Sequence, residues 1–378
     1  MNLTPMEEPL STTGASYVEP SADTPLKPGQ RVAHLFPRSV MGDYVLQRLT
    51  ARTFWFSRHF YGTLFYVGDR GVLLLDPIMG AADSLLKAIA SVTPLPVTAV
   101  CYSHFHTDHI GGTRRLVRLL DKPPRVIASE HTAAWMERFG SDLPLPGDIL
   151  AWPYDATDFE GVTLRLCGLP RPGHSPDHSV FLLAEERVGH SADLINIDQL
   201  PFGGFAGQDP LVLFKPNLEF ARDLDWDWFS GGHGNIGEKP DFDFYIRYLD
   251  EVTDLINEEI PRPEYVPDLS LTDYLDDLDM AAKERLLAGL DNHFSLYLYG
   301  RQIARGEKPD RGAAGPGAFR AGLVGQWAEQ RRQAVEEAVP RILERLRPKY
   351  GRMYNFDDAQ PINIRLLAMS MQPSLENR

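Results

Sequence analysis

Cysteine, long apolar runs and positive charge are all scarce in this 378-residue chain. The two cysteines, Cys101 and Cys167, lie in apolar, strand-like runs where a buried thiol is common, and two are too few for a disulfide framework. No apolar stretch is long enough to span a bilayer. We therefore expect a cytoplasmic protein without a membrane span.

The formal net charge of −14 disfavours polyanionic partners. It repels nucleic acid phosphates and anionic lipid unless a basic patch overrides it. Arg114, Arg115 and Arg118 are spaced like the solvated face of a helix and do not make such a patch. We predict a small-molecule substrate, with neither nucleic acid nor a membrane as partner.

Three regions differ in composition. Residues 1–30 are rich in Pro, Ser, Thr and Glu and lack the basic start and apolar run of a secretory signal, which predicts a flexible N-terminal arm and no export. The remaining length exceeds what one ordinary domain needs. We predict a catalytic domain at 31–260 and a helical C-terminal extension at 261–378.

Alternating strand and helix signals predict an α/β domain. Strands are expected at 62–67, 72–75, 97–102, 125–128, 162–167 and 179–184, a helix at 81–89, and a loop-like chain after Asp193. In the extension, helices are expected at 281–290, 292–305 and 319–347, with a loop at 306–317.

The last of these helices carries an apolar face that has to be buried. Val335, Val339, Ile342 and Leu346 recur with the helical period, and Pro340 is expected to kink or divide the helix. We expect this extension to serve as a specificity cap over the site, as a homodimer element, or as both.

The chemistry is concentrated in His104-Phe105-His106-Thr107-Asp108-His109, which directly follows a predicted buried strand. In an extended segment His104 and His106 point to the same side, as two ligands of one metal require. The turn that follows directs Asp108 and His109 toward a neighbouring site. Imidazole and carboxylate ligands suit zinc, with iron and manganese as alternatives.

This pattern, followed by Gly111-Gly112, resembles the signature of metallo-β-lactamase-fold hydrolases, with a ligand set like that of lactonases and glyoxalase II. The resemblance implies a four-layered αββα sandwich. It also implies that His174 completes the first metal site, that Asp193 bridges two divalent ions, and that His233 completes the second site. An aspartate at 193 argues against antibiotic hydrolysis, because true β-lactamases of this fold do not use that bridge.

Further residues are assigned supporting roles. Asp76, at the end of a predicted strand, resembles the family's early structural aspartate, which orients the ligands. His178 and His190 lie close to ligands in the sequence and are expected to support them. The remaining histidines His131 and His293 are expected to have no role in the site.

A dinuclear hydrolase is the function that the resemblance implies. In that function a hydroxide bridging the two metals is expected to attack an apolar lactone, ester or amide, and Asp108 or a metal-bound water to carry a proton to the leaving group. Aromatic residues near the first strand and after Asp193 are expected to line an apolar pocket: His59, Tyr61, Phe202 and Phe205. The alternatives are a mononuclear iron persulfide dioxygenase of the same fold and a non-catalytic binding protein.

Overall fold

The computed structural model describes residues 9–208, 211–260 and 316–371, without the side chains of 212 and 316–331. The described residues form two compact units. One contains those of Met1–Val252 and Arg345–Ser370, and the other those of Thr253–Glu344 and Met371–Arg378. The helices expected at 281–290 and 292–305, and His293, lie outside the described residues.

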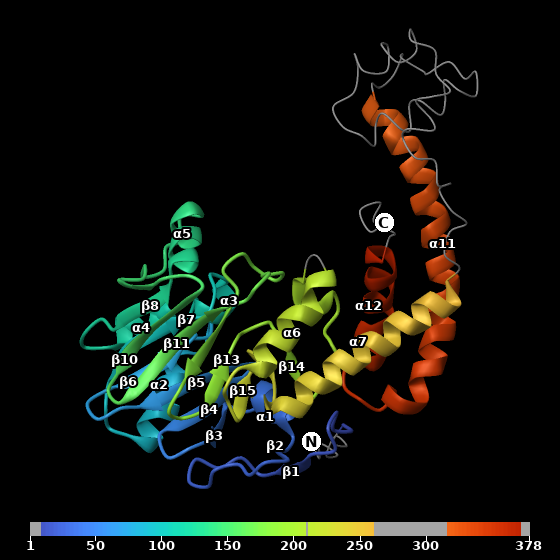
Figure 1. The fold of residues 1–378 in the computed structure, drawn as a ribbon. Helices are drawn as coiled ribbons and strands as arrows, with labels where there is room; N and C mark the ends of the chain where they lie inside the picture. The colour runs from blue at the N-terminus through green and yellow to red at the C-terminus, as the bar shows by residue number, and fades with distance from the viewer. Residues whose placement is uncertain (1–8, 209–210, 261–315, 372–378) are drawn as a thin grey trace, which may run out of the picture. The chain divides into compact units, whose positions relative to one another are not determined.

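Two sheets form the centre of the first unit (Figure 1). The larger has nine strands, in which β14-β16-β5-β6-β7-β8-β9 form a continuous order and β4 and β3 are added beside β5. The smaller has the order β10-β11-β12-β13-β15-β17. A separate parallel pair joins β1 (Ser16–Val18) to β2 (Gln30–Val32) within and after the predicted N-terminal arm.

The strands have the following bounds. The larger sheet contains β3 (Val45–Arg48), β4 (Thr53–Arg58), β5 (Tyr61–Val67), β6 (Val72–Leu75), β7 (Val97–Tyr102), β8 (Arg125–Ser129), β9 (Asp148–Leu150), β14 (Asn196–Ile197) and β16 (His233–Gly234). The smaller contains β10 (Tyr154–Phe159), β11 (Val162–Gly168), β12 (Ser179–Leu183), β13 (Val188–His190), β15 (Trp228–Ser230) and β17 (Ile236–Gly237).

The helices are listed in chain order. They are α1 (Leu35–Met41), α2 (Ala82–Val92), α3 (Thr107–Ile110), α4 (Thr113–Leu119), α5 (Glu130–Arg138), η1 (Phe205–Gly207), η2 (Leu211–Leu213), α6 (Phe214–Asp223), α7 (Lys239–Glu259), α11 (Pro316–Tyr350) and α12 (Phe356–Ser370).

Strand alternation explains why β6 is apolar on both faces. Leu73 and Leu75 belong to the core between the two sheets, which also contains Leu164 and Phe181 of the smaller sheet. Val72 and Leu74, and with them the alternate residues of β5 and β7, pack instead against α2, α4 and α5. A strand buried on both faces reads as a continuous apolar run.

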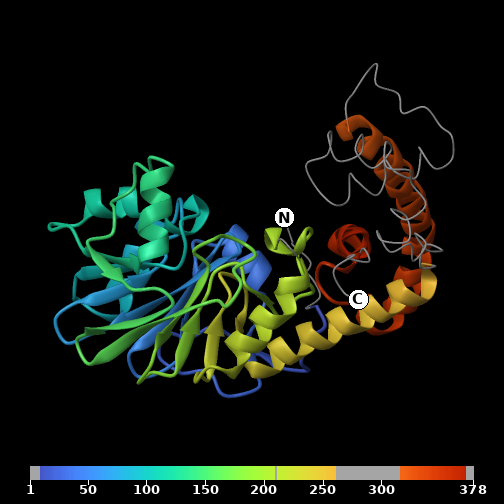
Figure 2. The same cartoon turned by 45° about the horizontal axis from the view of Figure 1, so that its top comes forward.

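Helices cover both outer faces, which completes the αββα sandwich. Figure 1 and Figure 2 show α4 and α5 on one side of the strands and α6 on the other. On the α6 side, Phe242 of α7 packs edge-on against Phe229 of β15, with ring centroids 4.9 Å apart. The predicted α/β sandwich with a helical C-terminal region is therefore confirmed.

Individual elements match the predictions to different degrees. The strands expected at 72–75 and 97–102 have the observed bounds of β6 and β7. The chain after Asp193 is less loop-like than expected, since it contains the ten-residue helix α6. The predicted loop at 306–317 also ends early, because α11 begins at Pro316.

The C-terminal helices contribute to both units. Val335, Val339, Ile342 and Leu346 are all buried, as their helical spacing predicts. Pro340 does not divide the helix, because α11 continues through it to Tyr350. Among the described residues, no helix combines the length and apolar character needed to cross a bilayer.

α12 belongs to the first unit and fastens the segment that follows Asp193. The side-chain amide of Asn363 donates to the Pro201 carbonyl at 3.0 Å and accepts from the Gly204 N–H at 2.9 Å. Gln360 donates to the same Pro201 carbonyl at 2.9 Å. Residues 201–204 are therefore held by buried hydrogen bonds from a segment far away in sequence.

Candidate metal centre

Asp193 lies at the centre of the histidine cluster. It follows β13, and its backbone has a φ of 65°, an unfavourable conformation for a residue other than glycine. Its N–H donates to the Gly231 carbonyl at 2.9 Å, and its own carbonyl accepts from the Gln208 side chain at 3.0 Å. These bonds hold the strained backbone so that the carboxylate faces the histidines.

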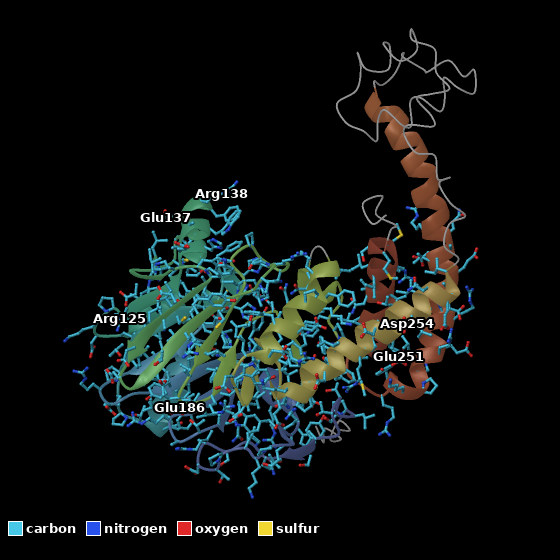
Figure 3. All side chains as sticks on the ribbon, viewed as in Figure 1. Arg125, Glu137, Arg138, Glu186, Glu251 and Asp254 are labelled. Carbon is cyan, nitrogen blue, oxygen red and sulfur yellow. The ribbon has the colours of Figure 1, made fainter. Side chains whose placement is uncertain are left out.

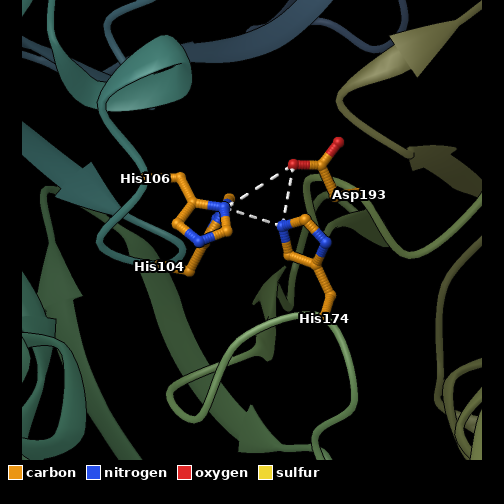
Figure 4. A group of neighbouring side chains, drawn as sticks. All are labelled: His104, His106, His174 and Asp193. Carbon is orange, nitrogen blue, oxygen red and sulfur yellow. Dashed lines mark hydrogen bonds and ion pairs between the residues drawn. The ribbon is translucent and has the colours of Figure 1, made fainter. Parts of the chain in front are cut away.

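The first group of side chains contains His104, His106, His174 and Asp193 (Figure 4). The Nε2 atoms of His174 and His104 lie 3.1 and 3.6 Å from Oδ2 of Asp193. His106 Nδ1 lies 2.8 Å from His174 Nε2. All four ligand atoms lie within 4.8 Å of one another, a spacing that suits one metal ion.

The second group contains Asp108, His109, His233 and the same Asp193. His109 Nε2 lies 2.9 Å from Asp193 Oδ2, and His233 Nε2 lies 3.0 Å from Asp193 Oδ1. Asp108 Oδ2 is 3.6 Å from His109 Nε2. Asp193 thus faces both groups, and its two oxygens point to different histidines.

Strand ends and a short helix deliver these side chains. His104 and His106 follow β7, and α3 begins immediately after them, which turns Asp108 and His109 into the second group. His233 lies on β16, where it pairs with Asn196 of β14 on one side and Tyr61 of β5 on the other. The structure therefore brings together all seven side chains that the sequence nominates as ligands.

The chemistry of this donor set fits a pair of divalent ions. Burial lowers the pKa of His104 well below its usual value and also lowers that of His106, which favours the neutral imidazole that binds metals. Burial alone would raise the pKa of Asp193, but facing imidazoles hold it well below its ordinary value. His104 Nε2 is buried with no hydrogen-bond partner among the described residues, as expected of a nitrogen reserved for a metal.

Hydrogen bonds fix which nitrogen of His104 carries the proton. Ser103 donates both its N–H, at 2.8 Å, and its hydroxyl, at 2.6 Å, to the carboxylate of Asp76. Because the hydroxyl hydrogen is used there, Ser103 Oγ accepts from His104 Nδ1, which lies 3.0 Å away. The lone pair of His104 is left on Nε2, which faces Asp193.

His174 is oriented in a similar way by the backbone. Its Nδ1 donates to the carbonyl of Ala206 in η1, and this leaves the Nε2 lone pair toward the site. Ala206 itself has a φ of 53°. The sequence did not predict the supporting roles of Ser103, Ala206 and Gln208. Ala206 acts through its backbone carbonyl, so its side chain gives no indication of this role in the sequence.

The three residues expected to support the ligands are fully buried beside them. His190 Nε2 lies 2.8 Å from Asp76 Oδ2. Burial alone would raise the pKa of Asp76, but the hydrogen bonds from His190 and Ser103 lower it. His178 Nε2 donates to the carbonyl of Ala192 at 2.7 Å, which braces the residue before Asp193. Burial lowers the pKa of His178 to about 3.

The expected pocket residues do not behave alike. The Tyr61 hydroxyl donates to Asp108 Oδ2 at 3.3 Å, and the Phe202 ring lies 5.4 Å from that of His233. Burial raises the pKa of Tyr61 to about 12, so the phenol keeps its proton. Phe205 is buried, and its ring centroid lies 5.9 Å from that of Phe214. His59 is exposed at the β4–β5 turn and belongs to neither group of ligands.

The site opens to solvent at Asp108. Its side chain is 38% exposed, against 10% and 11% for those of His174 and His233. His104 and His109 are completely buried. The cluster is therefore most open on the side of Asp108.

Similar proteins share this part of the chain. Residues 60–233 match the family model described as the metallo-beta-lactamase superfamily. The "Atrochrysone carboxyl ACP thioesterase" of Passalora fulva is 29% identical over 47% of this chain and 50% of its own length. The "Beta-lactamase-like protein 2 homolog" of Caenorhabditis elegans is 28% identical over 43% of this chain and 51% of its own length.

The chain spans about half the length of the curated relatives it matches. A solved "Metallo-beta-lactamase from Pontibacter korlensis" aligns with a TM-score of 0.47 and 19% identity, over 55% of this chain and 99% of that one. Through residues 60–233 the chain matches the metallo-beta-lactamase superfamily.

Proposed function

We propose that this protein is a dinuclear metal-dependent hydrolase that cleaves an ester, thioester, lactone or amide bond of an apolar small molecule. The observation that carries the proposal is the position of Asp193. Its carboxylate faces imidazoles of both groups at 2.9 to 3.1 Å, as a bridge between two ions requires.

Each ion has its own set of protein ligands in this proposal. His104, His106 and His174 hold one, Asp108, His109 and His233 hold the other, and Asp193 is shared. Zinc suits these ligands, with iron and manganese as alternatives. When bound, such ions supply Lewis acidity and lower the pKa of water toward neutrality.

Asp108 and Tyr61 then act at the open side of the site. The exposed Asp108 carboxylate is placed to pass a proton to the leaving group, while its Oδ2 accepts from Tyr61. If Tyr61 gives up its hydrogen bond to Asp108, the single hydrogen of its hydroxyl can be donated instead to a substrate oxygen that enters there. The rings of Tyr61 and Phe202 border His233 and exclude water from one side.

The names of relatives favour a thioester among the candidate bonds. Proteins of Passalora fulva and Aspergillus fumigatus, 29% and 28% identical, are both named as acyl carrier protein thioesterases. A thioester and an oxygen ester present the same carbonyl to the site. The substrate proposal therefore places thioesters first.

Metal analysis combined with a substrate panel tests the proposal. We expect about two transition-metal ions per chain and hydrolysis of acyl thioesters or esters that is lost on chelation. Asp193→Ala should remove both activity and at least one ion, whereas Asp225→Ala, at an exposed surface carboxylate, should not. Iron as a single bound ion, unchanged by excess metal, would support the persulfide dioxygenase instead.

A further inference from the structure

Three aromatic rings form a continuous surface beside the proposed metal centre. Phe105, Trp135 and Phe139 are each in contact with the other two, with ring centroids 5.3 to 6.0 Å apart. Their planes are nearly parallel, at 20 to 24°. We call these three residues the aromatic wall.

The aromatic wall begins at the metal ligands. The Phe105 ring lies 4.8 Å from that of His106, and Phe105 itself stands between His104 and His106 in the sequence. The loop that places these two ligands therefore also places the inner ring. Any group bound on the wall lies next to the first group of ligands.

The outer end of the wall is open to solvent. Phe139, directly after α5, is 63% exposed, and Trp135 and Phe105 are only partly buried. The Arg138 guanidinium lies 4.7 Å from the centre of the Trp135 ring, and Figure 3 shows Arg138 at the outer end of α5. An exposed aromatic cluster contributes little to the core, and contiguous apolar surface of this kind marks binding sites.

We propose that the aromatic wall binds a planar aromatic acyl group of the substrate and so sets acyl specificity. Near-parallel rings offer flat π faces, which favour another planar ring over a flexible aliphatic chain of similar area. The carbonyl attached to this acyl group then lies beside Phe105, close to the first group of ligands. This inference rests on the proposed hydrolase function.

The substitution that tests the wall is Phe139→Ala, at its most exposed ring. The probes are 2-naphthoyl and octanoyl thioesters of N-acetylcysteamine, assayed with the metal-loaded full-length protein. We expect about a tenfold rise in KM for the naphthoyl probe, and less than twofold for the octanoyl probe. Phe139→Leu, which keeps apolar area without the ring, should raise the naphthoyl KM as well. Leu366→Ala, at an exposed leucine of α12, should change neither.

Equal effects of Phe139→Ala on both probes, or no effect on either, would overturn the proposal. Activity lost only when the naphthoyl group is carried on an acyl carrier protein would assign the wall to protein docking and also overturn it. Circular dichroism verifies that each variant is folded.

A binding measurement separates this inference from the proposed function. Binding of 2-naphthoate, followed by quenching of tryptophan fluorescence and by calorimetry, needs no turnover. The wild-type protein could hydrolyse neither probe and yet bind naphthoate about tenfold more tightly than the Phe139→Ala variant does. That result would reject the proposed hydrolase function and support the proposed binding role of the aromatic wall. Unchanged naphthoate binding in that variant rejects the wall whether or not hydrolysis occurs.

Discussion

His190 Nε2 lies 2.8 Å from Asp76 Oδ2, and both side chains are completely buried. The same carboxylate accepts two hydrogen bonds from Ser103, whose hydroxyl oxygen in turn accepts from His104. Asp76 therefore connects His190 of β13 to His104, which follows β7, and determines the protonated nitrogen of that proposed ligand.

Asp76→Asn should weaken metal binding more than it weakens the fold. An amide nitrogen replaces one acceptor oxygen and faces a buried donor, which costs about 1–3 kcal/mol of stability. Loss of such a supporting partner typically lowers metal affinity by roughly 10–100-fold. Chelator competition and thermal denaturation measure the two effects. Asp225→Asn is the exposed control, and unchanged affinity in the Asp76 variant would contradict this role.

Substituting a single ligand should remove one ion and keep the other. His233→Ala deletes a ligand that belongs to the second group alone, so the group of His104, His106 and His174 remains intact. We expect metal content to fall from about two to about one ion per chain, with activity falling at least a hundredfold. Retention of both ions after dialysis would show that His233 is not a ligand.

Gly232 should tolerate no side chain. Its φ is +80°, and an added Cβ would lie 2.6 Å from Cα of Ala192, directly before Asp193. Gly232→Ala should lower the free energy of unfolding by roughly 2–4 kcal/mol, since strain and a backbone clash add together. Gly80→Ala is a matched control, with a φ of +74° and nothing within 4 Å, and should cost about 1 kcal/mol. An equal loss in the free energy of unfolding for the two variants, measured by denaturant titration, would mean that the backbone near Ala192 moves to accommodate the added Cβ at no cost.

Both cysteines should be unreactive in the folded protein. Burial raises the pKa of Cys167 to about 11 and that of Cys101 well above its ordinary value. A raised thiol pKa leaves less thiolate, about one part in a thousand at pH 8 for a pKa of 11. A disulfide reagent should therefore label neither within minutes at pH 8 and both after denaturation. Fast labelling of native protein would contradict this burial.

Asn363 should support the site from a distance. Asn363→Ala removes the hydrogen bonds that hold Pro201 and Gly204 on either side of Phe202. We expect a loss of about 1–3 kcal/mol in stability and a higher KM, because the Gly204 N–H loses its acceptor and the Pro201 carbonyl keeps only the hydrogen bond from Gln360. Leu366→Ala on the same helix is the control for both measurements. A chain ending before residue 261 lacks Asn363 too and should show the same defects; normal stability and turnover would contradict the role of α12.

The sequence predicted the side chains of the proposed centre better than their supports. The motif at 104–109 and the separated His174, Asp193 and His233 are recognisable because catalytic chemistry restricts side-chain identity. The Ala206 carbonyl orients His174 equally directly, but a backbone group is present at every residue and leaves no pattern.

The fold was predicted best where the pattern of apolar residues along a segment determines its secondary structure. The run Val72–Leu75 reads as a strand because both of its faces are buried. In contrast, α6 follows Gly203, Gly204 and Gly207, whose turn signals outweighed the short amphipathic segment at 214–223. The burial of Phe205 against Phe214 was not predicted, because an aromatic in a glycine-rich segment resembles an exposed residue.

The position of Asp193 in the chain has a consequence for synthesis. Both groups of ligands need this carboxylate, and the second also needs His233. On the ribosome, neither group has all of its ligands until residue 193 has been synthesised. The second group still lacks His233 for a further forty residues. If the proposed two-ion site is correct, the group of His104, His106, His174 and Asp193 is therefore the first whose ligands have all been synthesised.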